Sequence, residues 1–129
     1  MTLVEKSKVL MHSYASPVIT NKVCASDFDE DNAVIIPANI PSKDLGIVNT
    51  EKGMKGPKWF VLARKNKNEL LVIDGIDTID EYMQEKFFEL VKYKTISSVE
   101  FHVPIRIIIT CTDVQKVSKN LASLCQIVV

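Results

Sequence analysis

Three short apolar runs without polar alternation dominate the pattern of the chain. They occupy residues 33–36, 70–73 and 107–109. A strand of this kind is covered on both faces, as in a parallel sheet between layers of helices, whereas a half-solvated strand alternates apolar and polar residues. Residues 18–24 and 127–129 are β-prone and predict shorter strands. We therefore expect the three runs to lie side by side, in parallel, within one sheet.

Apolar residues at helical spacing separate these runs. The spacing predicts helices at residues 2–14, 58–65, 78–93 and 112–124. For residues 58–65 a strand is the competing interpretation, because Trp, Phe and Val are also β-prone. Strands and helices in alternation predict an α/β fold, a three-layer sandwich whose mainly parallel sheet is joined by right-handed crossovers.

The helix predicted at residues 78–93 has a distinct start signal. Thr78 and Glu81 have the spacing of a capping box, in which a hydroxyl and a carboxylate satisfy the first free amides of a helix. Its predicted buried stripe comprises Ile79, Met83, Phe87, Leu90 and Val91. Thr112 and Gln115 repeat the capping form ahead of a second stripe, which comprises Val114, Val117, Leu121 and Leu124.

Composition limits the class of protein. With 129 residues, 47% of them hydrophobic, and a formal net charge of zero, residues 1–129 are expected to form a single globular domain. No apolar run approaches the roughly 18 residues of a membrane span, and the first residues lack a signal-peptide pattern, so we expect a cytoplasmic protein without a membrane partner. Cys24, Cys111 and Cys125 have no metal-like spacing and predict buried thiols.

Charge gives little indication of a nucleic-acid partner. Sixteen basic residues balance sixteen acidic ones, so the chain has no overall field that would steer nucleic acid toward it. A local basic cluster at residues 64–67 nevertheless leaves nucleic-acid binding open.

Two acids directly follow the central run and are the first candidates for chemistry. Asp74 and Asp77 stand after residues 70–73, where a parallel strand would reach its carboxyl end. In open α/β sheets ligands bind at that edge, which favours a functional interpretation. The alternative is a plain turn, because Asp-Gly is a common turn dipeptide.

The segment that follows residues 33–36 can be compared with a phosphate-binding P-loop. Such a loop has Gly, four residues, Gly, Lys and then Ser or Thr, so that backbone amides can surround the phosphates. Here Pro37 and Ser42 stand at the glycine positions, Lys43 at the lysine and Asp44 at the hydroxyl. Only the lysine matches. An ordinary proline-containing loop is the alternative interpretation.

Residues 70–129 resemble the second half of an AAA+ ATPase core, in the style of clamp-loader subunits. Residues 70–77 resemble the Walker B strand, residues 107–112 the sensor 1 strand, and residues 121–127 the segment that carries the arginine finger. The resemblance implies a P-loop NTPase-like fold in which the strand at 107–109 lies between the other two apolar runs. It also implies that any nucleotide and Mg²⁺ would contact Lys43, Asp74, Asp77 and Thr110, with Asp74 ordering the metal.

The departures from this family are informative about activity. Gly75 replaces the acid that would polarise the attacking water, and Leu124 replaces the arginine. Phosphoryl transfer depends on several such groups acting together. The resemblance therefore implies a catalytically silent AAA+-like domain without a helical lid, which binds a protein partner or copies of itself in a replication or other ATPase assembly.

Two alternatives stay open. One is an active nucleotide-binding ATPase with an atypical phosphate loop, in which Lys43 and amides beyond Ser42 hold ATP and Mg²⁺. The other is an unrelated small α/β protein. No cofactor is expected under the favoured hypothesis.

Overall fold

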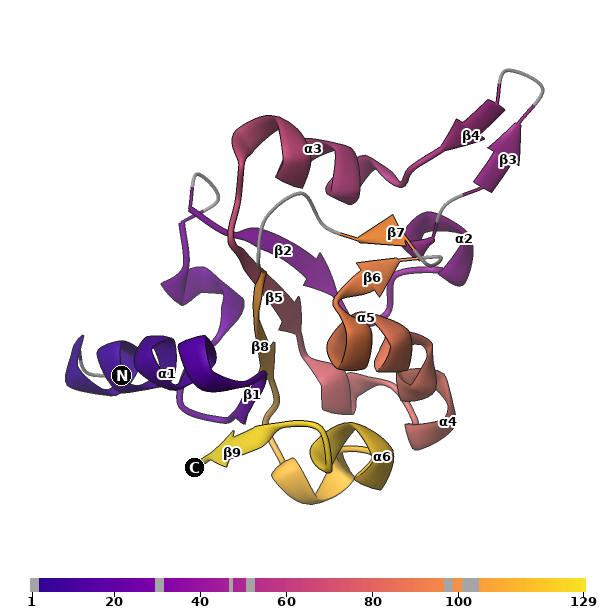
Figure 1. Cartoon of the computed structure of the whole chain (residues 1–129). Helices are drawn as coiled ribbons and strands as arrows, with labels where there is room; N and C mark the ends of the chain where they lie inside the picture. Colours follow the sequence, from indigo (N-terminus) through magenta and orange to yellow (C-terminus); the bar gives the residue numbers. More distant parts are fainter. Residues whose placement is uncertain (1–2, 30–31, 47, 51–52, 97–98, 101–104) are drawn as a thin grey trace.

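The computed structural model describes residues 3–29, 32–46, 48–50, 53–96, 99–100 and 105–129, and contains a five-stranded parallel sheet (Figure 1). The strand order is β2-β5-β8-β1-β9. These strands are β1 (Val18–Thr20), β2 (Val34–Pro37), β5 (Leu70–Asp74), β8 (Arg106–Thr110) and β9 (Gln126–Val128). Every described pairing in this sheet is parallel, so all five carboxyl ends lie along one edge.

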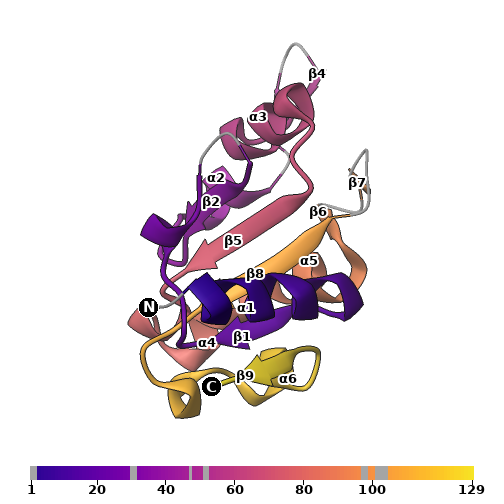
Figure 2. The ribbon, with the colours of Figure 1, turned by 90° about the vertical axis from the view of Figure 1, so that its left-hand side faces the viewer.

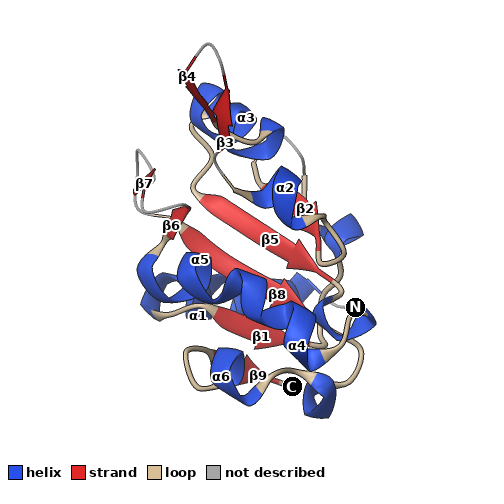
Figure 3. Cartoon of the chain, turned by 90° about the vertical axis from the view of Figure 1, so that its right-hand side faces the viewer, coloured by secondary structure: helices blue, strands red, loops and turns tan. Residues whose placement is uncertain are grey.

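Helices cover both faces of the sheet. Helix α1 (Leu3–Ala15) crosses one face (Figure 2), whereas α4 (Glu81–Gln84), α5 (Phe88–Tyr93) and α6 (Lys119–Ala122) cover the other (Figure 3). Helix α2 (Ser42–Leu45) and helix α3 (Lys58–Asn66) lie beside β2. No helix among the described residues is long and apolar enough to cross a membrane.

Shorter elements join the main ones. In the described part of the chain, the 3-10 turns are η1 (Ala25–Asp27), η2 (Ile76–Thr78), η3 (Glu85–Phe87) and η4 (Val114–Lys116). Outside the main sheet, β3 (Val48–Thr50) pairs antiparallel with β4 (Gly53–Lys55), and β6 (Thr95–Ile96) pairs antiparallel with β7 (Val99–Glu100).

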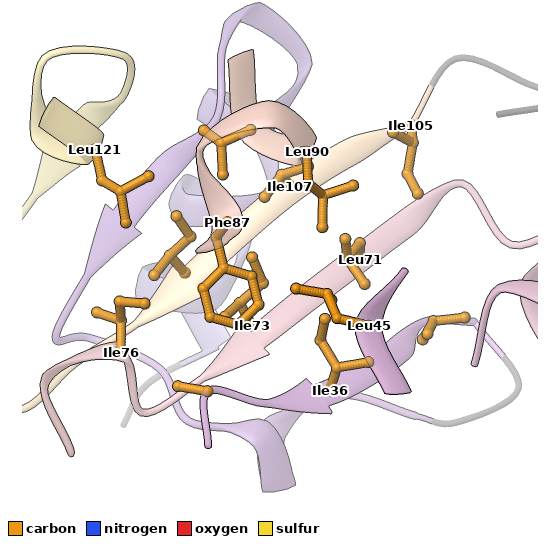
Figure 4. Close-up of a cluster of buried hydrophobic side chains, with 14 of the residues drawn as sticks. Ile36, Leu45, Leu71, Ile73, Ile76, Phe87, Leu90, Ile105, Ile107 and Leu121 are labelled. Carbon is orange, nitrogen blue, oxygen red and sulfur yellow. The ribbon is translucent and has the colours of Figure 1, made fainter. Parts of the chain in front are cut away.

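Alternation along the central strands divides the core between the two faces. In β5, Val72 packs in the cluster beneath α1, whereas Leu71 and Ile73 pack in the cluster beneath α5. Phe87 lies at the centre of the second cluster (Figure 4) and is fully buried. The side chains on both faces of β5 are apolar because both faces are buried. This confirms the interpretation of the apolar runs without polar alternation.

The predicted arrangement of the three runs is confirmed in most respects. Strands β2, β5 and β8 are adjacent and parallel, with Ile35 opposite Val72 and Val72 opposite Ile108. Residues 58–66 form a helix rather than the competing strand. The helix predicted at 2–14 runs from Leu3 to Ala15, and Thr2 lies outside the described residues.

The predicted strand order is wrong in one respect. The strand at 107–109 does not lie between the other two runs, because β5 lies between β2 and β8. The other side of β8 is occupied by β1, whose Val18 and Ile19 are fully buried. An apolar run shows that a strand is covered on both faces, but it does not distinguish a central strand from an edge strand such as β2.

The predicted cap at Thr78 is also wrong. Residues Ile76–Thr78 form the turn η2, and the helix begins after Asp80, whose carboxylate accepts a hydrogen bond from the Met83 amide at 2.8 Å. The later start changes the buried face, so Met83 is exposed and Gln84 is fully buried. The turn η3 then interrupts the helix that was predicted to run unbroken to Tyr93.

The second capping signal leads to a turn before it leads to a helix. Asp113 accepts from the Gln115 amide at 3.0 Å and starts η4, and helix α6 follows only after Ser118. Val117 and Leu121 of the predicted stripe are buried. Among the thiols predicted to be buried, Cys111 is buried and Cys125 is partly buried, but Cys24 is exposed.

Candidate functional site

The carboxyl ends of β5 and β8 bring Asp74 and Thr110 into direct contact. The Thr110 hydroxyl donates to Asp74 Oδ1 at 2.9 Å and accepts from the Gly75 amide at 2.9 Å. The contact follows from the register, which places Ile73 opposite Ile109 so that the next residue of each strand reaches the same edge. The predicted pair is therefore assembled, but its polar atoms bond to each other.

Gly75 turns the chain sharply away from β5. Its φ of 73° and ψ of 46° lie in the left-handed region, which residues with a Cβ rarely adopt. The Thr78 amide and hydroxyl both donate to the Gly75 carbonyl, at 2.9 and 2.6 Å. Thr78 thus closes the turn after the strand instead of capping the following helix.

Asp77 joins this turn to the loop after β8. Its Oδ2 accepts from the amides of Thr112 and Asp113, at 3.0 and 2.8 Å. Its Oδ1 is buried and has no hydrogen-bond partner within the described part of the chain. Asp77 therefore lies at the edge predicted for it, where it acts as an internal clamp between two loops.

The electrostatic character of this edge is negative. Burial raises the pKa of the Cys111 thiol to about 11, and the charges of Asp77 and Asp113 add to the shift. Like charges disfavour a second anion there, including a phosphate. Among the described residues no three His, Cys, Asp or Glu side chains gather where they could hold a metal ion, so Asp74 is not part of such a group.

Lys43 and the predicted acids do not line the same cavity. Lys43 is exposed on α2 and lines a cavity of about 1030 Å³, whose lining does not include Asp74, Asp77 or Thr110. The structure thus brings three of the four predicted contact residues to one edge and places the lysine beside β2.

The loop at residues 37–44 uses its own amides internally. The amides of Ala38, Ile40 and Asp44 donate to the carbonyls of Asp74, Pro37 and Pro41, at 2.9, 3.1 and 2.9 Å. Lys86, whose pKa is lowered by burial, donates to the Ile40 carbonyl at 2.6 Å. These bonds favour the ordinary loop over a phosphate cradle, because a cradle needs converging free amides.

The cavity lined by Lys43 was not predicted from the sequence. Strand β2 forms one wall and α3 the other, and the apolar side chains that line it include Ile36, Trp59, Val61 and Leu62. Val61 and Leu62 are exposed although they belong to a helix that buries Trp59 and Phe60. A second apolar stripe on the helix at 58–65 was the signal that could have indicated this cavity.

The fold and the edge define the class of this chain as a small α/β protein with a five-stranded, all-parallel sheet. A scan against models of protein families finds no match, and a search of curated proteins finds none either.

Proposed function

We propose that the chain is a catalytically silent, AAA+-like module that binds a protein partner within a replication or other ATPase assembly. The observation that carries the proposal is the sheet order combined with the Asp74–Thr110 hydrogen bond. In the AAA+ order the sensor 1 strand lies between the Walker B strand and the P-loop strand. Here β8 lies between β5 and β1, an order that supports β1 as the counterpart of the P-loop strand.

This assignment moves the expected phosphate loop to the residues after β1. That segment has no glycine between residues 21 and 27. The Lys22 amide donates to the Thr20 hydroxyl at 3.0 Å, and the Cys24 amide donates to the Asp27 carboxylate at 2.8 Å. Two amides that could face a phosphate are therefore already bonded, and Asp27 adds a negative charge.

The groups expected to act in hydrolysis are also replaced. Gly75 stands where a water-polarising acid is expected, and Leu124 stands at the position of the arginine finger. The Asp74 carboxylate accepts a hydrogen bond from the Thr110 hydroxyl. Loss of an arginine finger by itself lowers the rate by about a thousandfold or more, so hydrolysis by this chain is not expected.

Calorimetric titration with Mg-ATP and a phosphate-release assay test the proposal. We expect neither binding at micromolar concentration nor turnover. Lys22→Ala and Lys43→Ala compare the two candidate loops, and Asp74→Asn tests the metal. Micromolar binding that one lysine variant abolishes, together with turnover that Asp74→Asn abolishes, would show an active ATPase and identify its phosphate loop.

A further inference from the structure

Strand β2 has one unpaired edge with hydrogen-bonding groups. Among the described strands, it pairs with β5 alone. The Ala38 amide donates to the Asp74 carbonyl, so by alternation Ile36 and Val34 also face β5 and Ile35 faces outward. Besides the ladder, no hydrogen bond of the Ile35 backbone is present among the described residues. The outward edge therefore offers a donor and an acceptor at Ile35.

The groove beside this edge is lined on its far side by α3. The cavity of about 1030 Å³ is bounded by Ile35 of β2 and by Trp59 and Leu62 of α3. A second cavity of about 330 Å³ is bounded by the same three residues and extends along β2 to Ala33. Together they form a trough along the outer edge of β2, which we call the β2–α3 groove.

The charge of the groove favours an acidic occupant. Lys43 and Lys58 line it, and among the described residues that line it Asp44 is the one with an acidic side chain. Helix α3 has no acidic residue, and its exposed Arg64 adds positive charge nearby. Acidic side chains beside an apolar segment would therefore be attracted to this groove.

We propose that the β2–α3 groove binds an extended peptide segment of a protein partner, in which apolar residues alternate with acidic ones. The peptide backbone bonds to Ile35 as a short added strand, as in β-augmentation. The apolar residues of the peptide contact Trp59 and Leu62, and its acidic residues reach Lys58 and Lys43, all of which line the same cavity. This proposal rests on the proposed function in one respect, namely that the ligand is a protein.

The strand limits how much can be added to it. Strand β2 has four residues, a length of about 13 Å, and ends at Pro37, which has no amide to donate. Because the Pro37 carbonyl already accepts from Ile40, only a short segment can pair here. A short, proline-terminated edge suits one bound peptide and disfavours continuous sheet growth.

Calorimetric titration with blocked synthetic peptides tests the proposal, with the emission of Trp59, the one tryptophan of the chain, as a second signal. A peptide alternating valine and glutamate is expected to bind. A valine and lysine peptide is expected to bind at least about tenfold more weakly. Two N-methylated versions, one for each set of alternate amides, are expected to differ, because only one set faces β2.

Protein variants locate the binding. Lys58→Glu is expected to weaken binding about tenfold, whereas Lys65→Glu, on the same helix but outside the groove lining, is expected to change it less than about twofold. Leu62→Asp and Met11→Asp, both at exposed positions, form a second pair, in which only Leu62→Asp is expected to weaken binding.

Several results would overturn the groove proposal. They are equal binding of the two N-methylated peptides, full affinity in Lys58→Glu, or no binding of the valine and glutamate peptide. Binding of a single-stranded DNA oligonucleotide in place of the peptide, weakened equally by Lys58→Glu and Lys65→Glu, would assign α3 to nucleic acid. The Mg-ATP assays test a separate proposal. If the protein neither binds ATP nor binds the peptide, only the groove proposal is refuted. If it binds the peptide and also hydrolyses ATP, only the proposal of catalytic silence is refuted.

Discussion

Two borders of the same sheet differ in how far the chain satisfies its own polar groups. At the carboxyl ends of β5 and β8, Asp74 bonds to Thr110, and Asp77 bonds to two amides. Along the outer edge of β2, the Ile35 backbone faces the β2–α3 groove. The sequence motifs point to the first border. The partner site that we propose lies at the second, because groups already paired within the chain gain little from a ligand.

The largest effect is expected from the core behind the closed border. Phe87 is fully buried, so Phe87→Ala is expected to lower the free energy of unfolding by about 3–5 kcal/mol. Leu62→Ala in the groove is the matched change, and because Leu62 is exposed it is expected to cost within about 0.5 kcal/mol. Urea unfolding measures both. Equal costs would mean that the groove is part of the packed core.

The next effect tests whether Thr110 holds the closed border together. Thr110→Val keeps the shape but removes the acceptor of the Gly75 amide and the donor to Asp74, and is expected to cost about 1–3 kcal/mol. Thr112→Val is the control, because the exposed Thr112 is bonded to Asp77 through its amide, which the change keeps. Similar stability of the two variants in urea would show that the Asp74–Thr110 pair is unimportant.

A smaller effect distinguishes the observed helix start from the one expected at Thr78. Asp80→Ala removes the side-chain acceptor of the Met83 amide and is expected to cost about 1 kcal/mol. Thr78→Ala removes one exposed bond to Gly75 and is expected to cost about 0.5 kcal/mol. Thermal unfolding of both variants shows which one loses more stability. A larger loss of stability for Thr78→Ala would mean that Thr78 caps the helix.

The smallest effect concerns the thiols and pH. Burial raises the pKa of Cys111 to about 11 and that of Cys125 to about 12, above the value of about 8.5 in an unfolded chain. The stability that the two protonated, buried thiols contribute is therefore fully present below a pH of about 8.5. It is lost as the pH rises toward the pKa values of the thiols in the folded protein. Melting curves measured across this alkaline range are expected to fall less steeply in Cys111→Ala.

Reactivity provides the control for that prediction. Cys24 is exposed, so a thiol reagent at neutral pH is expected to modify it well before Cys111. Fast modification of Cys111 in the folded protein would contradict the burial of its thiol.

The strands were predictable because burial on both faces leaves a direct mark on sequence. Residues such as Val72 and Ile108 must be apolar on whichever face they point to. The position of β1 was not predictable on the same basis, since a three-residue strand shows too little pattern to rank above β2. The order β2-β5-β8-β1-β9 depends on which strands pair, and that information is not local.

The candidate site was predictable only where neighbouring strands determine it. Asp74 and Thr110 each end a predicted strand, so adjacency and register bring them together. Lys43 follows a strand that proved to be at the edge of the sheet, and its position in sequence gave no sign of that. The groove escaped prediction because it forms between β2 and α3, and the apolar side chains of Val61 and Leu62 mark only one of its two walls.

The left-handed turn at Gly75 bears on how readily this protein could change its chemistry over time. A Cβ at this position would lie 3.2 Å from Thr78 Cγ2 and would occupy a backbone conformation that costs an L residue about 1–2 kcal/mol. Gly75→Glu would therefore have to remodel the turn as well as supply a carboxylate. A carboxylate introduced at this position would therefore carry the cost of the left-handed backbone together with a shift of Thr78.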